Sequence, residues 1–126
     1  MQVQPGLTVL IIDDDKFLLR LMAKEIQKVG YNVISADQGK QAVEVLSHQK
    51  VDLIVVDLMM PEMDGLVFLR WLRQEAGLNI PTLVQTAMVK RDTEQSVMEA
   101  GANALIFKPV KPPDLIAKIQ EIEKLI

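Results

Sequence analysis

Acidic and basic side chains stand at the ends of several apolar runs in this sequence. Three consecutive aspartates, 13–15, follow the first run, and Asp57 follows the third. Thr86 follows the fourth run and Lys108 the fifth. Carboxylates hold hard cations or act as nucleophiles, and a lysine ammonium suits a phosphate oxygen. The pattern indicates phosphoryl chemistry, provided that the fold brings these run ends together.

The electrostatics of such a cluster are restrictive. Two carboxylates about 4 Å apart repel by roughly 4 kcal/mol at an effective dielectric constant near 20. Asp13, Asp14 and Asp57 would therefore disfavour one another's ionised forms unless a cation lay among them. Mg²⁺ suits this position, because it binds one or two carboxylates together with water and phosphate oxygens. With Mg²⁺ and Lys108 present the formal charges cancel, and such a site stabilises an incoming phosphoryl group.

Short apolar runs rich in β-branched residues alternate with segments of helical spacing. The runs, typical of strands buried on both faces, are 8–12, 32–36, 53–56, 82–85 and 104–107. The helical segments are 18–29, 40–48, 66–75, 93–100 and 113–125. This alternation predicts the fold class α/β, a doubly wound (βα)5 flavodoxin-like sandwich with a parallel sheet of order 2-1-3-4-5. The four polar run ends then meet at the carboxyl edge of the sheet, where such folds bind ligands.

The first helix has a clear apolar pattern. Leu18, Leu21, Met22, Ile26 and Val29 are predicted to share the face that packs on the sheet. The glycine that follows is a plausible C-terminal stop.

Length and composition limit the classes of protein to which this chain can belong. The chain has 126 residues, 49% hydrophobic and 25% charged, which predicts a single domain over 1–126 with a core of about 7–125. The net charge of −3 argues against direct nucleic-acid binding. No run reaches the roughly 20 apolar residues of a membrane span. Without cysteine or a secretory signal, we expect a cytoplasmic protein.

Several segments resemble the response-regulator receiver domains of two-component signalling. They include LTVLIIDDD, VDLIVVDLMMPEMDGLVFLRWLR, IPTLVQTAM and AGANALIFKPV. The resemblance covers about residues 7–125, and the stretch from Asp57 through Pro61 to Gly65 is highly specific for the family. It implies a phosphorylated signalling switch, not an enzyme, that assists only its own phosphotransfer and dephosphorylation.

The resemblance assigns the reacting group and the metal ligands. Asp57 would be the phosphoacceptor. Asp13, Asp14, Asp57 and the backbone carbonyl of Met59 would hold Mg²⁺, for which Mn²⁺ is able to substitute.

It also implies roles for residues on the last two strands. Thr86, the backbone N–H of Ala87 and Lys108 would bind the phosphoryl group, and the bond before Pro109 would be cis. Met88, together with the methionine two residues after the phosphoacceptor, would tune the lifetime of the phosphoryl group.

The usual aromatic switch residue is replaced by Leu105, a departure from the family that leaves the output mechanism open. The readout surface would be the fourth helix, fifth strand and fifth helix, about residues 93–125. The expected partners are a histidine kinase or phosphotransfer protein as phosphohistidine donor, with a small acyl phosphate as alternative donor, and an unknown output protein or domain. The resemblance also leaves open whether two copies of the chain form a homodimer.

Three other functions compete with this interpretation. A receiver-like module could bind partners without phosphorylation, although such modules usually lose an acidic or lysine position. A phosphohydrolase of the haloacid-dehalogenase type would use Asp13 as nucleophile and Asp15 as its second acid, but it normally needs a larger chain. A flavodoxin would need a phosphate-binding loop rich in Ser, Thr and Gly after the first strand, which this chain lacks.

Overall fold

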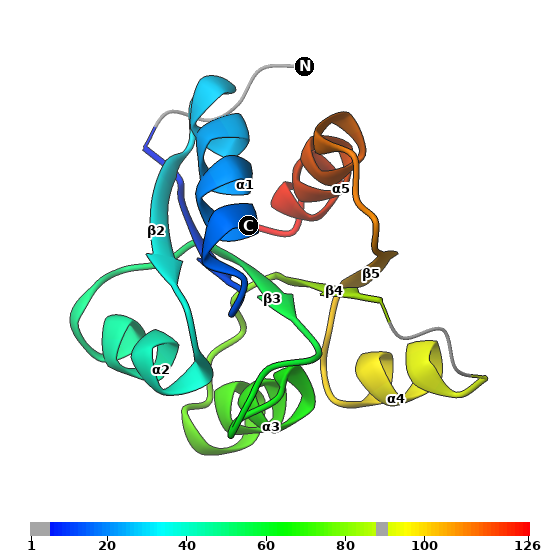
Figure 1. Cartoon of the computed structure of the whole chain (residues 1–126). Coiled ribbons are helices and arrows are strands. Elements are labelled where there is room, and N and C mark those ends of the chain that lie inside the picture. Colours follow the sequence, from blue (N-terminus) through cyan, green and yellow to red (C-terminus); the bar gives the residue numbers. More distant parts are fainter. Residues whose placement is uncertain (1–5, 88–90) are drawn as a thin grey trace.

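The sheet runs through the middle of the molecule with helices on both sides (Figure 1). The structure, a computed structural model, describes residues 6–87 and 91–126. The strands are β1 (Thr8–Ile12), β2 (Asn32–Ala36), β3 (Leu53–Asp57), β4 (Thr82–Thr86) and β5 (Ala104–Phe107). The helices are α1 (Lys16–Lys28), α2 (Gly39–His48), α3 (Gly65–Arg70), η1 (Trp71–Glu75), α4 (Thr93–Glu99) and α5 (Pro112–Glu123).

All strand pairs are parallel, and the order is β2-β1-β3-β4-β5. The predicted α/β fold, a doubly wound flavodoxin-like sandwich with sheet order 2-1-3-4-5, is therefore confirmed. Two strands extend one residue beyond the predicted ends, so that Asp57 closes β3 and Thr86 closes β4. Both side chains thus belong to the regular alternation of the sheet.

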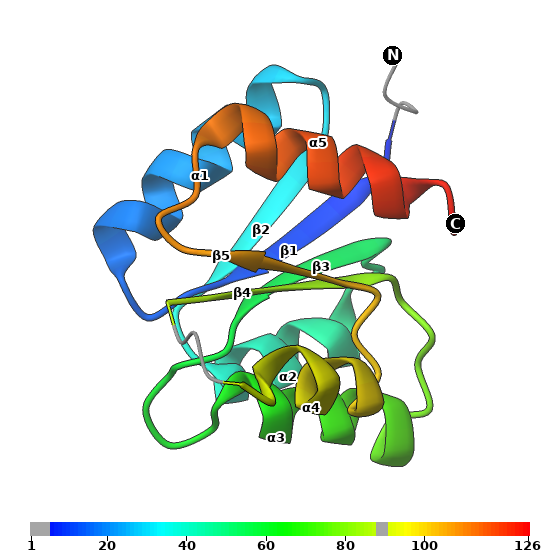
Figure 2. The same ribbon diagram turned by 90° about the vertical axis from the view of Figure 1, so that its right-hand side faces the viewer.

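Two layers of helices cover the sheet (Figure 2). Helices α1 and α5 lie on one face, while α2, α3 and α4 lie on the other. The side chains of each strand alternate between the two cores, as the pleat requires. In β1, for example, Val9 and Ile11 face α1 and α5, and Leu10 and Ile12 face the opposite layer. The central strands β3 and β4 are buried along their whole length, whereas the edge strands β2 and β5 are partly exposed.

The packing face of α1 differs from the predicted one. Met22 and Ile26 are buried as expected, but the third buried position is Leu19. Leu21 and Val29 are 42% and 36% exposed. The helix is therefore rotated so that an i, i+3, i+7 stripe meets the sheet, and Leu21 lies toward solvent.

The predicted helix at 66–75 is divided in the structure. It is α-helical to Arg70 and continues as the π-helical turn η1, in which Ala76 N–H donates to the carbonyl of Trp71. The wider turn accompanies an unusual placement of Arg73, whose guanidinium donates to the carbonyls of Leu78 and Gly101 at 2.8 and 3.0 Å. Arg73 thus ties this helix to the turn between α4 and β5.

Within the described ranges, none of the helices has the length and apolar character needed to cross a bilayer.

Candidate functional site

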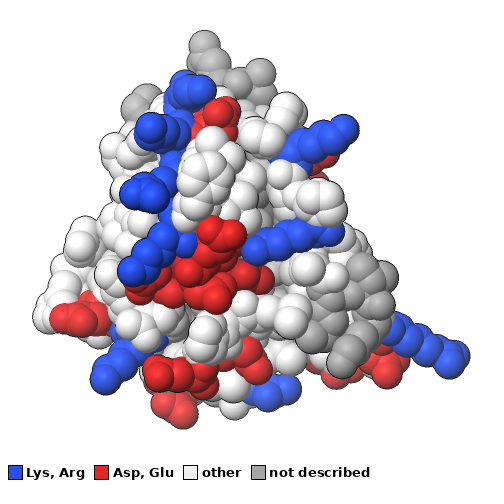
Figure 3. All heavy atoms as spheres, in the orientation of Figure 1, with Lys and Arg blue, Asp and Glu red and all other residues white. Residues whose placement is uncertain are grey.

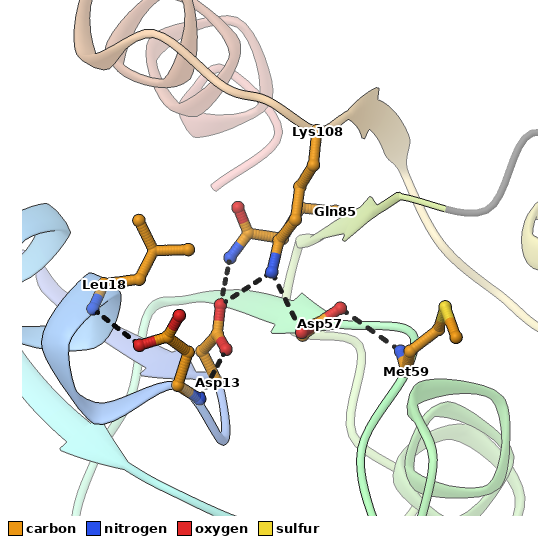
Figure 4. Close-up of polar contacts among 7 residues, drawn as sticks. Asp13, Leu18, Asp57, Met59, Gln85 and Lys108 are labelled. Atoms are coloured by element: carbon orange, nitrogen blue, oxygen red, sulfur yellow. Dashed lines mark hydrogen bonds and ion pairs between the residues drawn. The ribbon is translucent and has the colours of Figure 1, made fainter.

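Four polar side chains converge at the carboxyl edge of the sheet. The register pairs Asp57 on β3 with Gln85 on β4 and sets Asp13 directly after β1. Because side chains alternate along each strand, Asp13, Asp57 and Gln85 share the α1–α5 side of the sheet. Lys108, directly after β5, reaches the same place (Figure 4).

Lys108 bridges the two buried carboxylates. Its Nζ lies 3.0 Å from Asp13 Oδ2 and 3.0 Å from Asp57 Oδ2. Asp13 and Asp57 are 1% and 4% exposed, so neither carboxylate relies on bulk water for its stabilisation. Charge-assisted hydrogen bonds in such surroundings are stronger than neutral ones, and they fix the orientation of both carboxylates.

Asp14 completes an acidic cluster with an open side. One carboxylate oxygen from each of Asp13, Asp14 and Asp57 lies within 4.8 Å of the other two. Asp14 is exposed, whereas its two partners are buried. Three hard oxygen ligands at this spacing, with one side toward solvent, fit a divalent cation that keeps several waters.

Backbone groups and one further side chain orient the buried carboxylates. The N–H of Asp15 donates to Asp13 Oδ1 at 2.9 Å, and the N–H of Met59 donates to Asp57 Oδ1 at 3.2 Å. Gln85 Nε2 lies 3.5 Å from Asp13 Oδ2, a long contact with the same oxygen that Lys108 binds. Gln85 was not among the predicted site residues. Its signal in the sequence is a polar amide directly after the apolar pair Leu83 and Val84, one residue before the strand end.

The three consecutive aspartates have three different surroundings. Asp13 is buried against Lys108, and Asp14 faces solvent beside it. Asp15 caps α1, because its side chain accepts the N–H of Leu18 at 3.1 Å. This cap explains why α1 begins immediately after the site.

The loop after Asp57 is closed tightly by Gly65. The N–H of Gly65 donates to the carbonyl of Leu58 at 2.8 Å. A Cβ at this position would lie 2.7 Å from the carbonyl oxygen of Asp57 and 2.8 Å from the Cα of Leu58. Only glycine allows this approach without a backbone shift. The start of α3 is therefore held directly against the end of β3, and this contact fixes both ends of the loop from Asp57 to Gly65.

The pKa values in the site follow from burial and from the ion pairs. Burial raises the pKa of the Asp57 carboxyl above its usual range, although Lys108 opposes this by hydrogen bonding and charge. For Lys108, burial acts to lower the pKa of the ammonium, but Asp57 and Asp13 outweigh it and the pKa is raised. Lys108 therefore stays protonated across the physiological range.

Thr86 and Leu105 belong to the other side of the sheet by the alternation of β4 and β5. Thr86 is fully buried at the end of β4, and its carbonyl accepts the N–H of Lys108 at 2.7 Å. Leu105 pairs with Val84 in register and packs against the core under α2, α3 and α4. Phe107 has the same parity as Leu105, but it is 42% exposed.

The remaining predicted positions lie around the site. Ala87, directly after β4, is exposed, and so is the side chain of Met59, at 51%. The peptide bond between Lys108 and Pro109 is cis, as the resemblance implies. Met88 lies outside the described residues.

Comparison with known protein families gives a consistent result. A model of the response regulator receiver domain matches residues 9–120. The phosphate regulon transcriptional regulatory protein PhoB of Pseudomonas aeruginosa is 33% identical over 118 residues, which cover 93% of this chain and 52% of that protein. The polar-differentiation response regulator DivK of Brucella anthropi is 30% identical over 114 residues, or 90% of this chain and 93% of DivK.

Solved structures agree with the fold. The receiver domain of the Francisella response regulator 1452 superimposes with a TM-score of 0.89 at 27% identity, covering 95% of this chain and 98% of that one. The chemotaxis protein CheY4 of Vibrio cholerae gives 0.87 at 26% identity, with 93% and 98% covered. The chain spans about half the length of several curated relatives, among them PhoB and the Bacillus subtilis regulator PhoP, of which 47% is covered.

Proposed function

This chain belongs to the response regulator receiver domain family, and we propose that it is a switch set by phosphorylation of Asp57 in a Mg²⁺-dependent reaction. The observation that carries the proposal is the ammonium of Lys108, placed 3.0 Å from both Asp13 and Asp57 with Asp14 close by. One buried, oriented carboxylate beside a fixed cation and a metal-sized acidic cluster is what acyl phosphate formation requires.

Each side chain has a distinct part in the reaction. Asp57 presents a carboxylate oxygen that attacks phosphorus, forming an O–P bond as the P–N bond to the donor imidazole breaks. The electron pair of that bond stays on the imidazole nitrogen. Lys108 pairs with the developing negative charge, and the hydroxyl of Thr86 and the N–H of Ala87 bind phosphoryl oxygens.

The metal would be held by Asp13, Asp14, Asp57 and the backbone carbonyl of Met59. Bound there, Mg²⁺, or Mn²⁺ in its place, supplies positive charge that neutralises phosphoryl oxygens. The donor in this scheme is a phosphohistidine of a histidine kinase or phosphotransfer protein. The chain then acts as a cytoplasmic signalling protein without nucleic-acid binding of its own.

The readout in this proposal is the surface of α4, β5 and α5, where an output protein, an output domain or a second copy would bind. Phosphorylation adds charge and new hydrogen bonds at the site, and thereby shifts the population between two states of this surface. Leu105 lies under this surface in the place of the usual aromatic residue. It can move within an apolar core, but it offers no hydroxyl to a partner.

Incubation with acetyl phosphate tests the proposal directly. We expect intact-mass measurement to show one added phosphoryl group when Mg²⁺ is present and none when EDTA removes it, because the uncompensated carboxylates then repel the phosphate. The Asp57→Asn variant should gain nothing. Equal phosphorylation of this variant, or phosphorylation that ignores EDTA, would contradict the proposal. No added phosphoryl group under any of these conditions would favour a receiver-like module that works without phosphorylation.

A further inference from the structure

Gln85 places a buried amide within the site. It shares its side of β4 with Leu83, which belongs to the core under α1 and α5. Burying an amide in such surroundings costs free energy unless the amide is hydrogen bonded. Figure 3 shows the acidic patch of the site open to solvent, whereas Gln85 is only 1% exposed. An aliphatic side chain would suit this core position at least as well, so packing alone does not account for the amide.

The amide of Gln85 contacts the same oxygen as the ammonium of Lys108. Gln85 Nε2 lies 3.5 Å from Asp13 Oδ2, and Lys108 Nζ lies 3.0 Å from it. Because a carboxylate only accepts hydrogen bonds, the amide presents its donor side. Figure 4 shows both donors pointing at Asp13. The amide contact is longer than the usual N–H···O distance of about 2.9 Å, so Lys108 is the main donor and Gln85 a second, weaker one.

The orientation of the Asp13 carboxylate depends on a donor at each of its oxygens. The last torsion of an aspartate side chain is soft, so it is the hydrogen bonds that fix the plane of the carboxylate. At Oδ1 the donor is the backbone N–H of Asp15, at 2.9 Å, which does not involve Lys108. At Oδ2, the described side chains that donate are those of Lys108 and Gln85. When Lys108 moves away from Oδ2, Gln85 is the side chain that remains within reach.

Phosphorylation gives the ammonium of Lys108 a new partner. In the acyl phosphate the carboxyl group of Asp57 no longer carries its charge, while the phosphoryl oxygens carry a larger one. The ammonium is therefore attracted toward the phosphoryl group and away from Asp13. Gln85 Nε2 then needs to approach Asp13 Oδ2 by only about 0.6 Å to form a hydrogen bond of ordinary length.

We propose that Gln85 is a positioning residue, which replaces Lys108 as the donor to Asp13 Oδ2 when Lys108 turns to the phosphoryl group, and so keeps Asp13 oriented as a metal ligand. This inference rests on the proposed function, since it assigns a further role within the same site. Groups that hold metal ligands by hydrogen bonds typically contribute about 10–100-fold to metal affinity. The amide therefore matters little while Lys108 is bound to Asp13 and strongly once it is not.

A double-mutant cycle on Mg²⁺ binding tests the proposal. Gln85→Met removes the donor and keeps an unbranched, flexible side chain. With Lys108 in place, we expect isothermal titration calorimetry to give a Kd for Mg²⁺ within about twofold of that of the unaltered chain. In the Lys108→Met background, the same change at Gln85 should weaken Mg²⁺ binding roughly tenfold. Equal effects of Gln85→Met in the two backgrounds would overturn the proposal.

Beryllofluoride, which mimics a phosphoryl group on an aspartate, tests the same exchange of donors with Lys108 present. We expect the Mg²⁺ concentration for half-maximal beryllofluoride binding, followed by fluorine NMR, to rise roughly tenfold in Gln85→Met. In proton–nitrogen NMR spectra, the side-chain amide signal of Gln85 is assigned by its absence in this variant. Its proton should shift downfield when Mg²⁺ and beryllofluoride are added, because the hydrogen bond to Asp13 shortens. An amide signal that does not move, or an unchanged Mg²⁺ requirement, would contradict the proposal.

Thr82→Val is the matched control on the same strand. Thr82 is also fully buried, but it lies at the other end of β4, where its hydroxyl donates to the carbonyl of Ile80 at 2.9 Å. The change removes a buried polar group from β4 without contact with the site. We expect Mg²⁺ and beryllofluoride binding within about twofold of the unaltered chain, even where urea unfolding shows a loss of stability. A loss of Mg²⁺ binding equal to that of Gln85→Met would attribute both effects to a weakened strand and overturn the proposal.

Different results would contradict this inference and the proposed function. If the unaltered chain binds Mg²⁺ and beryllofluoride and neither depends on Gln85, the role of Gln85 is overturned while the chemistry of Asp57 stands. If the unaltered chain binds no beryllofluoride in the presence of Mg²⁺ and gains no phosphoryl group from acetyl phosphate, the proposed function itself fails.

Discussion

Lys108 is the single side chain on which the geometry of the site depends most. It holds two buried carboxylates in place by ion pairs of equal length, and its own charge is secured by them. Removal of one member of such a group leaves the others buried without compensation. The ammonium also contacts one oxygen of each of two carboxylates that would hold a metal ion. We therefore expect Lys108 to act both as a partner of the phosphoryl group and as a competitor of the metal.

Replacing Lys108 by methionine should therefore have two opposite effects. We expect phosphorylation by acetyl phosphate to slow by about 10²–10³-fold, the usual cost of one lost electrostatic group in such a site. Mg²⁺ should bind more tightly, because no ammonium competes for Asp13 and Asp57. Isothermal titration calorimetry and intact-mass time courses measure the two quantities.

The exposed Lys111→Met serves as the control and should change neither value. Weaker Mg²⁺ binding by Lys108→Met would show that the lysine supports the metal site rather than competing with it.

At the scale of elements, the site is fixed by how strands end and helices begin. Asp57 is the last residue of β3, and Asp15 is the N-cap of α1. The loop after Asp57 returns to Gly65, the first residue of α3, which contacts the backbone of Asp57 and Leu58. The position of the Asp57 carboxylate thus depends on the packing of a helix start against a strand end.

Gly65→Ala tests this contact. Alanine is the better helix former by up to about 1 kcal/mol, so a change without a clash would stabilise α3. We expect instead a loss of about 1–3 kcal/mol in the free energy of unfolding, because the Cβ must displace the backbone of Asp57. Urea unfolding followed by the fluorescence of Trp71 measures it.

Val67→Ala, at an exposed position of the same helix, should stay within about 0.5 kcal/mol of the unaltered chain. A Gly65→Ala variant as stable as this control would show that the backbone of Asp57 and Leu58 moves aside without loss of stability.

On the scale of the whole molecule, a buried hydrogen bond far from the site links the segment before β2 to the end of α5. The phenol of Tyr31, just before β2, donates to Glu123 Oε1 at the end of α5, and both side chains are buried. Burial, and then the neighbouring Glu123, raise the pKa of Tyr31 well above its ordinary value. The folded state therefore prefers the neutral phenol.

This preference predicts a loss of stability at alkaline pH. The contribution of Tyr31 is complete below its unfolded-state pKa of about 10 and falls by about 1.4 kcal/mol per pH unit above it. Tyr31→Phe should lack this slope, and at neutral pH it should lose about 1–3 kcal/mol because Glu123 is left without its donor. Urea unfolding against pH measures both, and the difference between the two proteins cancels the shared lysine titrations.

Tyr31 is the only tyrosine of the chain, so phenolate absorbance follows it alone. Titration near its ordinary pKa in the folded protein would contradict this account.

The sequence was sufficient to predict the fold and the convergence of Asp13, Asp14, Asp57 and Lys108, because strand ends on one edge of a parallel sheet must meet. It did not reveal Gln85, since one amide in a buried strand has no periodic signal. The rotation of α1 was also missed: Leu18 and Leu19 are equally apolar, and only packing against the sheet decides which of them is buried. The π-helical turn occurs where Arg73 donates to the carbonyl of Gly101, a contact between distant parts of the chain that local propensity cannot register.

The identity of the phosphorylated aspartate tests the central claim most directly. After reaction with acetyl phosphate and Mg²⁺, borohydride reduction converts an acyl-phosphorylated aspartate to homoserine, and peptide mass spectrometry locates it. We predict homoserine at position 57 alone. Homoserine at position 13 would instead indicate the chemistry of a phosphohydrolase and contradict the assignment of Asp57 as phosphoacceptor.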